Sequence, residues 1–345
     1  NGSSTSKNNT NNATSNKTNS NKTSNTTSEV NDEVTIADLT TVTDSKINLA
    51  NATTNLLIDK AGTYTFTGDT NKTVVVDTDG DVSLVLDKAN FTSEKLPSIY
   101  VRNAVSTKIE LKNTSTITNN GNDEILNAAV YVRSPLSLTG SGTLTVTDKN
   151  GHGIKAKDDM TSKNVTLNIS AQEDGIHASD SLTIESGKYT ITSGDDGIQA
   201  NDNLIIKNGT FVIDAEGDGL HGDGDVELSN GTYTINAKSE GIESKANLLI
   251  TNGTYTINAT DDGLNAASSL TIKNGKLTIV SAQNDGIDSN GALTIEGGTV
   301  YATGLNNPEG AFDVDNTAFT IKGGTVVGLS ASATKPTEVA QNTIM

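Results

Sequence analysis

The sequence predicts an all-β fold, a right-handed parallel β-helix (a solenoid) whose coils each take about 22 residues. Three observations predict it. Two columns of glycine recur at this interval, short β-rich segments alternate with turn residues, and no segment keeps the period of an amphipathic helix.

The two glycine columns stay in phase through the second half of the chain. The first consists of Gly153, Gly175, Gly197, Gly219, Gly241, Gly263 and Gly286, and the second of Gly187, Gly209, Gly231, Gly253, Gly275 and Gly298. Each coil contains three short strands separated by turns, as at residues 197–200, 204–206 and 210–213. A leucine-rich repeat needs a Leu and Asn framework that is missing, and a propeller blade needs about 40 residues. Stacked coils joined by parallel sheets therefore fit best.

The chain divides into two parts. Residues 1–32 are mostly Asn, Ser, Thr and Lys, which bury too little apolar surface to order a chain, and predict a disordered linker. The linker is either the tether of a surface lipoprotein or a plain flexible tail. Residues 33–345 form the β-helix domain, with regular coils over 150–330. The chain ends without an obvious polar cap, so we expect a fragment of a longer protein.

Composition excludes several classes of function. The 24 Lys and Arg against 42 Asp and Glu give a net charge of −18, which argues against a nucleic-acid partner. The absence of cysteine removes disulfides, thiolate metal sites and cysteine nucleophiles. No run of apolar residues is long enough to span a membrane.

Aromatic residues recur at one position of the third strand. They are Tyr189, Phe211, Tyr233 and Tyr255. Strands stacked ~4.8 Å apart would bring these rings into a ladder. The ladder is either a platform for sugar rings or an internal packing ladder, and the buried Ile two residues later favours the internal position.

Acidic and amide residues surround the first glycine column. The residues just before each glycine are His152, Asp174, Asp196, Asp218, Glu240, Asp262 and Asp285, and in four coils Glu173, Asp195, Asp261 or Asn284 comes one position earlier. Two positions after each glycine come His177, Gln199, His221, Glu243, Asn265 and Asp288, which lie between inward residues and must face outward. The sequence therefore predicts a stripe of oxygen ligands along one edge.

A cation would stabilise this stripe. Two carboxylates ~5 Å apart repel by about 3 kcal/mol at an effective dielectric constant of 20. Calcium takes six to eight oxygen ligands, whereas zinc fits poorly where only two histidines are near. The alternative is that Asp-Gly is a good turn, which explains one acid in each turn but not the doubled acids.

Three groups spanning two coils have the best spacing for calcium. They are Asp174 with Asp195, Asp196 and Gln199; Glu240 with Asp261, Asp262 and Asn265; and Asp262 with Asn284, Asp285 and Asp288. A weaker fourth group joins Asp196 to Asp218, His221 and Asp223. His177, His221, Asp223 and Glu243 are candidate ligand-binding residues beside these groups. We expect His152 to be a plain surface residue.

These motifs resemble a known family. The Asp-Asp-Gly-Ile coils, the Asn-Gly-Thr turns and the Ser/Thr/Asn-rich leader are similar to those of bacterial β-helix carbohydrate-binding proteins, over roughly residues 35–335. The resemblance implies a surface or secreted protein that binds plant cell-wall polysaccharides such as cellulose and pectin. It also implies calcium sites similar to those of calcium-dependent pectate lyases of polysaccharide lyase family nine, with Gln199, Asn265 and Asn284 as amide substitutes.

Two functions follow as hypotheses. The first is calcium-dependent, noncatalytic binding of an acidic or neutral plant polysaccharide (pectin, polygalacturonate or cellulose) by a monomer that is extracellular or anchored at the cell surface. The second is a pectate-type lyase acting by β-elimination, for which Lys155 and Lys245 are the candidate bases. No Arg follows Arg133 to hold a uronate chain, which favours binding. A paired-carboxylate hydrolase and a purely structural stalk stay open.

Overall fold

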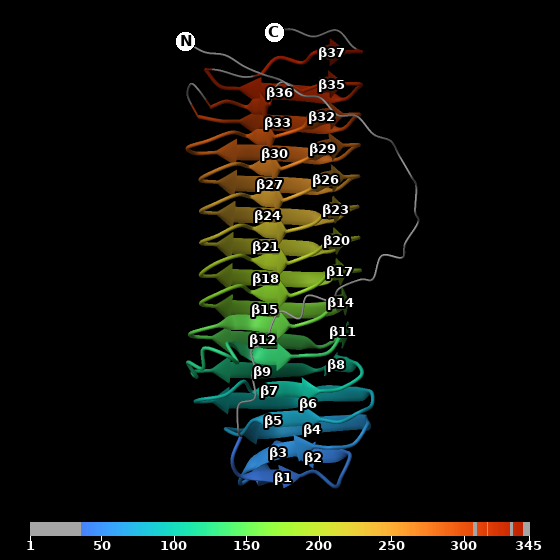
Figure 1. Ribbon diagram of the computed structural model, residues 1–345, viewed down its shortest axis with the longest axis vertical. Coiled ribbons are helices and arrows are strands. Elements are labelled where there is room, and N and C mark those ends of the chain that lie inside the picture. The colour runs from blue at the N-terminus through green and yellow to red at the C-terminus, as the bar shows by residue number, and fades with distance from the viewer. Residues whose placement is uncertain (1–35, 306–308, 316, 332–333, 341–345) are drawn as a thin grey trace, which may run out of the picture. The chain divides into compact units, whose positions relative to one another are not determined.

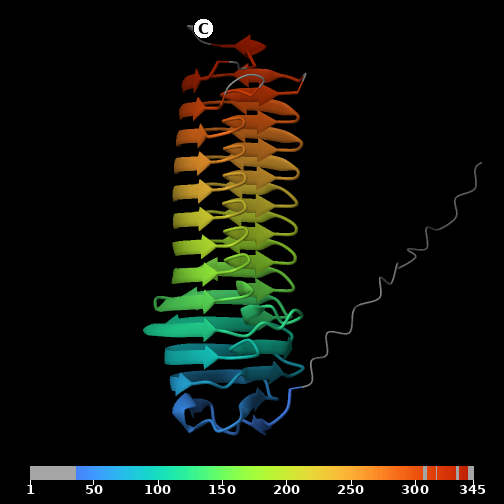
Figure 2. The same ribbon diagram turned by 90° about the vertical axis from the view of Figure 1, so that its left-hand side faces the viewer.

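The computed structural model describes residues 36–305, 309–315, 317–331 and 334–340. The predicted linker, residues 1–32, lies outside the described residues. Within these ranges, one short 3-10 helix, η1 (Leu49–Asn51), is accompanied only by strands, and every strand pairing is parallel. Figures 1 and 2 show successive coils stacked on one another. The all-β parallel β-helix is thereby confirmed.

One strand from each coil forms a 13-stranded sheet, the first sheet. Its strands, in spatial order, are β1 (Leu39–Thr41), β3 (Asn55–Ile58), β5 (Val74–Asp77), β7 (Ile99–Asn103), β10 (Ala128–Val132), β13 (His152–Ala156), β16 (Ile176–Ala178), β19 (Ile198–Ala200), β22 (Leu220–Gly222), β25 (Ile242–Ser244), β28 (Leu264–Ala266), β31 (Ile287–Ser289) and β34 (Phe312–Val314).

The other strands form a 24-stranded sheet, which consists of two ladders joined by two long strands. These long strands are β4 (Gly62–Thr70) and β6 (Val82–Ser93), and β6 pairs with both β8 and β9. One ladder contains β2 (Lys46–Asn48), β8 (Thr107–Lys112), β11 (Leu136–Gly140), β14 (Met160–Lys163), β17 (Leu182–Ile184), β20 (Leu204–Ile206), β23 (Val226–Leu228), β26 (Asn247–Ile250), β29 (Ser269–Ile272), β32 (Ala292–Ile295), β35 (Phe319–Ile321) and β37 (Glu338–Val339). The other contains β9 (Thr114–Asn119), β12 (Thr143–Asp148), β15 (Val165–Ala171), β18 (Gly187–Ser193), β21 (Thr210–Ala215), β24 (Thr232–Ala237), β27 (Thr254–Ala259), β30 (Lys276–Ser281), β33 (Thr299–Thr303) and β36 (Thr325–Leu329).

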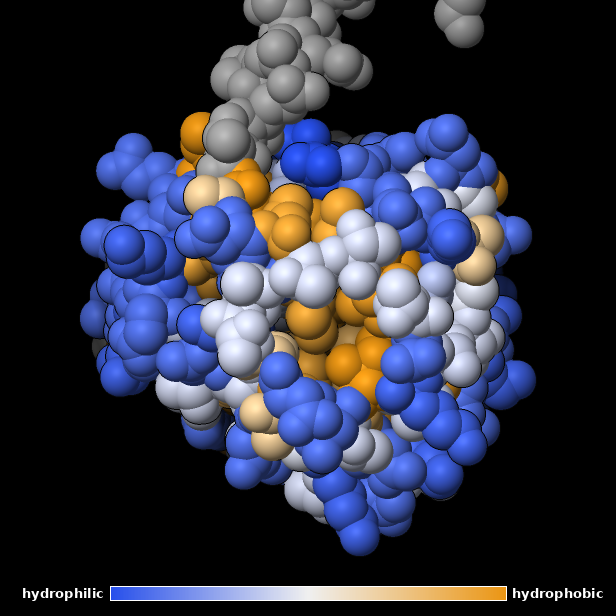
Figure 3. Space-filling model, turned by 90° about the horizontal axis from the view of Figure 1, so that it is seen from below, coloured by the Kyte–Doolittle hydropathy of each residue, from blue (hydrophilic) through white to orange (hydrophobic). Residues whose placement is uncertain are grey.

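Inward-facing side chains fill the centre of every coil. In the coil that begins with β16, the apolar residues Ile176, Leu182 and Ile184 are fully buried. Seen from the β1 end, apolar residues occupy the middle of the coil and hydrophilic residues surround them (Figure 3). The hydrophobic core therefore runs along the axis of the stack, as the alternation of the sequence predicts.

The aromatic ladder belongs to this core. The ring centroids of Tyr189, Phe211, Tyr233 and Tyr255 lie 4.8, 4.8 and 4.5 Å apart in succession, and the ring planes differ by at most 5°. Each ring is at most 1% exposed. The tyrosine hydroxyls donate to backbone carbonyls, as Tyr233 does to Asn230 O at 2.8 Å. A buried ladder cannot be a platform for sugars, so the internal packing interpretation is confirmed.

Close packing explains both glycine columns. A Cβ on Gly219 would lie 2.3 Å from Ile235 Cγ2 and 2.5 Å from the carbonyl oxygen of Gly241. In the second column, Gly209 has φ +150°, a conformation that side-chain-bearing residues rarely adopt. The first column therefore needs glycine because a side chain at the coil corner would clash with its neighbours. The second column needs glycine because of its backbone conformation.

Candidate functional site

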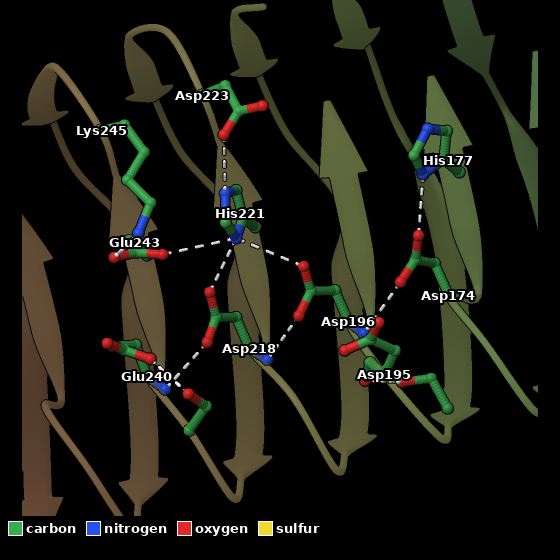
Figure 4. A network of polar contacts seen from close by, with 12 residues as sticks. Asp174, His177, Asp195, Asp196, Asp218, His221, Asp223, Glu240, Glu243 and Lys245 are labelled. Atoms are coloured by element: carbon green, nitrogen blue, oxygen red, sulfur yellow. Dashed lines mark hydrogen bonds and ion pairs between the residues drawn. The ribbon is translucent and has the colours of Figure 1, made fainter. Parts of the chain in front are cut away.

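The first sheet brings the predicted ligands into register. The middle residues of its short strands form what we call the outer column, which contains His177, Gln199, His221, Glu243, Asn265 and Asp288. The residues that come three positions earlier form the inner column, which contains Asp174, Asp196, Asp218, Glu240, Asp262 and Asp285. Figure 4 shows Asp174, Asp196, Asp218 and Glu240 of the inner column beside His177, His221 and Glu243 of the outer column.

The inner column of the predicted stripe lies beneath the surface. Its five aspartates are only 2–8% exposed. The reason is a second role, because one oxygen of the side chain accepts a backbone N–H from the next coil. Asp174 Oδ1 accepts from Asp196 N at 3.0 Å, Asp196 Oδ1 from Asp218 N at 2.7 Å, and Asp218 Oδ1 from Glu240 N at 3.0 Å. Beyond turn formation, these aspartates therefore join successive coils.

The second oxygen of several inner-column carboxylates faces the outer column. Asp174 Oδ2 lies 2.8 Å from His177 Nδ1, and Asp218 Oδ2 lies 2.8 Å from His221 Nδ1. Asn265 Nδ2 donates to Asp262 Oδ2 at 3.4 Å. The Asp-Gly-Ile/Leu spacing thus leaves one oxygen of each such carboxylate directed at a partner three residues later.

Two sets of charged ligand atoms converge in the middle of the row. Ligand atoms of Asp196, Asp218 and His221 lie within 4.8 Å of one another, as do those of Asp218, Glu240 and Glu243. The first of these is the core of the predicted fourth group, the one ranked weakest, whose Asp223 Oδ1 lies 3.1 Å from His221 Nε2.

The other predicted groups are placed as follows. Asp174 contacts His152 and His177, while Gln199 lies beside His177 in register. In the second group, the structure brings Glu240 to Asp218 and Glu243. In the third, Asn284 Nδ2 donates to Asp261 Oδ1 at 2.5 Å. The charges of Asp288, Asp261 and Asp285 all act on Asp262.

Burial and mutual repulsion perturb these acids. Burial, together with the charges of Asp288, Asp261 and Asp285, raises the pKa of Asp262 to about 8. Burial and the neighbouring Glu309 raise the pKa of Asp285 to about 7, and burial with Asp313 and Asp315 raises that of Asp288 to about 6. Among the described residues, this end of the row therefore lacks a compensating positive charge near neutral pH.

His221 supplies such a charge in the middle of the row. Burial lowers its pKa, but hydrogen bonds to Asp196 and Asp218 outweigh burial and raise the pKa to about 11. Its Nδ1 lies 2.8 Å from Asp218, 3.3 Å from Asp196 and 3.4 Å from Glu243. The pKa of Asp218 is nevertheless raised to about 7, because burial and the adjacent Glu240 oppose this pairing.

The expectation that His152 is a plain surface residue is wrong, and the structure places Lys155 beside it. His152 is 7% exposed rather than a plain surface residue, because it heads the inner column. Its Nε2 lies 2.7 Å from Glu173 Oε2, and its Nδ1 lies 3.1 Å from Asp174 Oδ2. Lys155 Nζ lies 3.0 Å from His152 Nε2 and 3.1 Å from Asn127 Oδ1, so Lys155 is not a freely solvated side chain.

Asn127 and the corner groove were absent from the sequence analysis. Asn127 comes from the loop between β9 and β10, outside the regular period, and no sequence signal marked it. The groove has a volume of about 630 Å³ and follows the stacked Asn-Gly-Thr turns, which include Asn208, Asn230 and Asn252. The repeat of these turns was visible in the sequence, but their concavity was not.

Comparisons with known proteins place the fold in a family. A family model described as "Carbohydrate-binding domain-containing protein" matches residues 51–283 and 230–342. A protein from Acetivibrio thermocellus with the same description is 32% identical over 131 residues, which cover 32% of this chain and 43% of that protein. The chain thus spans less than half the length of this relative.

Among solved structures, a gadolinium derivative of the polysaccharide lyase-like protein from C. thermocellum is 24% identical, with a TM-score of 0.43 over 75% of this chain and 95% of the other. No helix among the described residues is long and apolar enough to cross a membrane. By the match of the family model to most of its length, the chain belongs to the family of carbohydrate-binding domain-containing proteins.

Proposed function

We propose that this protein binds plant cell-wall polysaccharide without cleaving it, outside the cell or at its surface, and that the acidic row holds acidic polymers such as polygalacturonate through calcium. The observation on which this depends most is the cluster of Asp218, Glu240 and Glu243, whose carboxylate oxygens converge within 4.8 Å. Membership of the carbohydrate-binding family supports the polysaccharide as the class of ligand.

The donor set fits calcium. The cluster offers only carboxylate oxygens, which are hard ligands of the kind that calcium prefers. Asp262, Asp285 and Asp288 offer a second all-oxygen set, and burial together with the charges of neighbouring carboxylates raises their pKa values, an environment that a bound cation would relieve. When bound, calcium supplies positive charge that neutralises these carboxylates and attracts the carboxylates of a uronate polymer.

Charge makes the calcium requirement strict. The chain has a net charge of −18, and polygalacturonate is itself a polyanion. Without a cation, the row and the polymer repel each other, and physiological salt screens this repulsion only beyond about 8 Å. Binding of the acidic polymer should therefore disappear when calcium is chelated.

Neutral polymers have a different surface available. The Asn-Gly-Thr groove is lined by amide, hydroxyl and backbone groups, which can exchange hydrogen bonds with sugar hydroxyls. A cellulose-like chain bound there would need no calcium. Retention on cellulose that is unaffected by chelator and lost in Asn208→Ala/Asn230→Ala would support this second surface.

The lyase alternative needs a deprotonated base beside the cation. Lys245 Nζ lies 2.6 Å from Glu243 Oε1. Burial lowers the pKa of Lys245, but the hydrogen bond and charge of Glu243 outweigh it and raise the pKa. Lys155 contacts His152 and Asn127. These contacts favour binding over β-elimination. Unsaturated product formed from polygalacturonate with calcium, and abolished by Lys245→Ala or Lys155→Ala, would reverse this conclusion.

The binding proposal is tested by retention on immobilised polygalacturonate with calcium or with chelator. We expect wild-type retention with calcium only. Glu240→Gln/Glu243→Gln should lose it, because both substitutions remove charge from the cluster while preserving side-chain shape. Glu227→Gln is the matched control, since Glu227 is exposed in β23 on the other sheet and should retain wild-type binding. Equal retention with and without chelator would sink the proposal.

A further inference from the structure

Two of the three histidines of the chain lie together at one end of the row. His152 Nδ1 lies 3.1 Å and His177 Nδ1 2.8 Å from the same atom, Asp174 Oδ2. The two imidazole centroids are 4.9 Å apart, and the three ligand atoms lie within 4.8 Å of one another. The arrangement arises because a histidine heads the inner column in β13 and the next coil places His177 in the outer column.

This cluster differs chemically from the rest of the row. Two imidazole nitrogens and one carboxylate form the ligand set of many zinc sites, in which three protein ligands leave a fourth position for water. Calcium prefers oxygen ligands, so it fits this end poorly. Asp174 is 2% and His152 7% exposed, which limits competition from solvent.

Neighbouring contacts orient His152 as they do in metal sites. Its Nε2 lies 2.7 Å from Glu173 Oε2, and Asn127 Nδ2 donates to the same oxygen at 2.7 Å. A metal-binding histidine commonly donates its other ring N–H to a carboxylate in this way. The N–H of Asp174 lies 3.2 Å from His152 Nδ1, and in the tautomer that carries its proton on Nε2 this Nδ1 is the nitrogen that would bind a metal.

The remaining groups leave the three ligand atoms facing one another. Asp174 Oδ1 is used by the N–H of Asp196, so Oδ2 faces the histidines. Lys155 Nζ lies against the other ring nitrogen of His152 and against Asn127, outside the three-ligand cluster.

We propose that His152, Asp174 and His177 bind a transition-metal ion of the zinc class, at a site distinct in chemistry from the calcium positions of the same row. The sequence alone made zinc a poor choice for the row as a whole. At this end of the row the structure favours zinc over calcium, because two imidazole nitrogens from adjacent coils lie close to one carboxylate oxygen.

The test is titration of the chelator-treated protein with zinc in the presence of excess calcium, with cobalt absorption as a report of nitrogen ligation. We expect one equivalent of tight binding in the wild type and in His221→Gln, the control that removes the third histidine. His152→Ala and His177→Ala should lose it. Glu173→Gln removes no ligand and should weaken binding by about 10- to 100-fold.

Wild-type zinc affinity in both alanine variants, or displacement of zinc by calcium, would overturn the proposal. If the alanine variants do not fold, Glu173→Gln decides, and unchanged zinc affinity in this variant rejects the site.

Discussion

Truncation of one aromatic ring should destabilise the β-helix without touching its binding surface. Phe211 is 0% exposed, and its ring stacks on Tyr189 and Tyr233 at 4.8 Å on both sides. Phe211→Ala removes this buried ring and its stacking contacts on both sides, which should lower the free energy of unfolding by about 3–5 kcal/mol. At about 2 °C of melting temperature for each kcal/mol in a domain of this size, the melting temperature should fall by about 6–10 °C.

The assay is thermal melting followed by circular dichroism, together with retention on polysaccharide below the melting transition. Val212→Ala is the matched control, because Val212 follows in the same strand but points outward and is 40% exposed. It should change stability by no more than about 0.5 kcal/mol. A wild-type melting temperature for Phe211→Ala, or loss of polysaccharide binding by a fully folded Phe211→Ala, would refute the buried ladder.

The remaining predictions concern the backbone of the coil and the row. Asp196→Ala leaves the buried N–H of Asp218 without its acceptor and should lower the free energy of unfolding, measured by chemical denaturation, by about 1–3 kcal/mol. Asp196→Asn keeps an acceptor oxygen and should lower it less. Equal losses of stability in the two variants would contradict the coil-joining role. Gly219→Ala places a Cβ 2.3 Å from Ile235 Cγ2 and should reduce soluble expression far more than Gly297→Ala, whose Cβ would lie 3.0 Å from the nearest atom, Lys273 O. Similar yields of the two variants would contradict the packing argument. In chelator, the free energy of unfolding should fall as pH rises from about 4 to 8, because folded Asp262, with its pKa raised to about 8, keeps a proton that the unfolded chain releases near pH 4. Added calcium should reduce this fall. A free energy of unfolding that rises with pH in chelator would contradict the burial argument.

The repeat could be predicted from the sequence because its causes are local. Glycine recurs at the corner of each regular coil, where a Cβ would clash as it would at Gly219, and the alternation of apolar residues places Tyr189 and Ile191 inside. The outer column also follows directly, since equal coil lengths put His177, Gln199 and His221 on adjacent strands.

The depth of the inner column could not be predicted in the same way. Alternation distinguishes only the two faces of a strand, whereas Asp174 and Asp196 lie in turns just before their strands. Their burial results from hydrogen bonds to the next coil, which exist only after the coils stack. The environment of His152 depends in addition on Asn127, a loop residue with no place in the repeat.

The central claim is that calcium joins the acidic row to an acidic polysaccharide. Its most direct test is calorimetric titration of the wild-type protein with polygalacturonate fragments at a series of free calcium concentrations, with magnesium at equal ionic strength as the control cation. Affinity should rise with calcium, level off as the row fills, and vanish in chelator, while magnesium, which retains its water and demands a stricter geometry, should substitute poorly. Affinity that is the same in calcium, magnesium and chelator would contradict the claim.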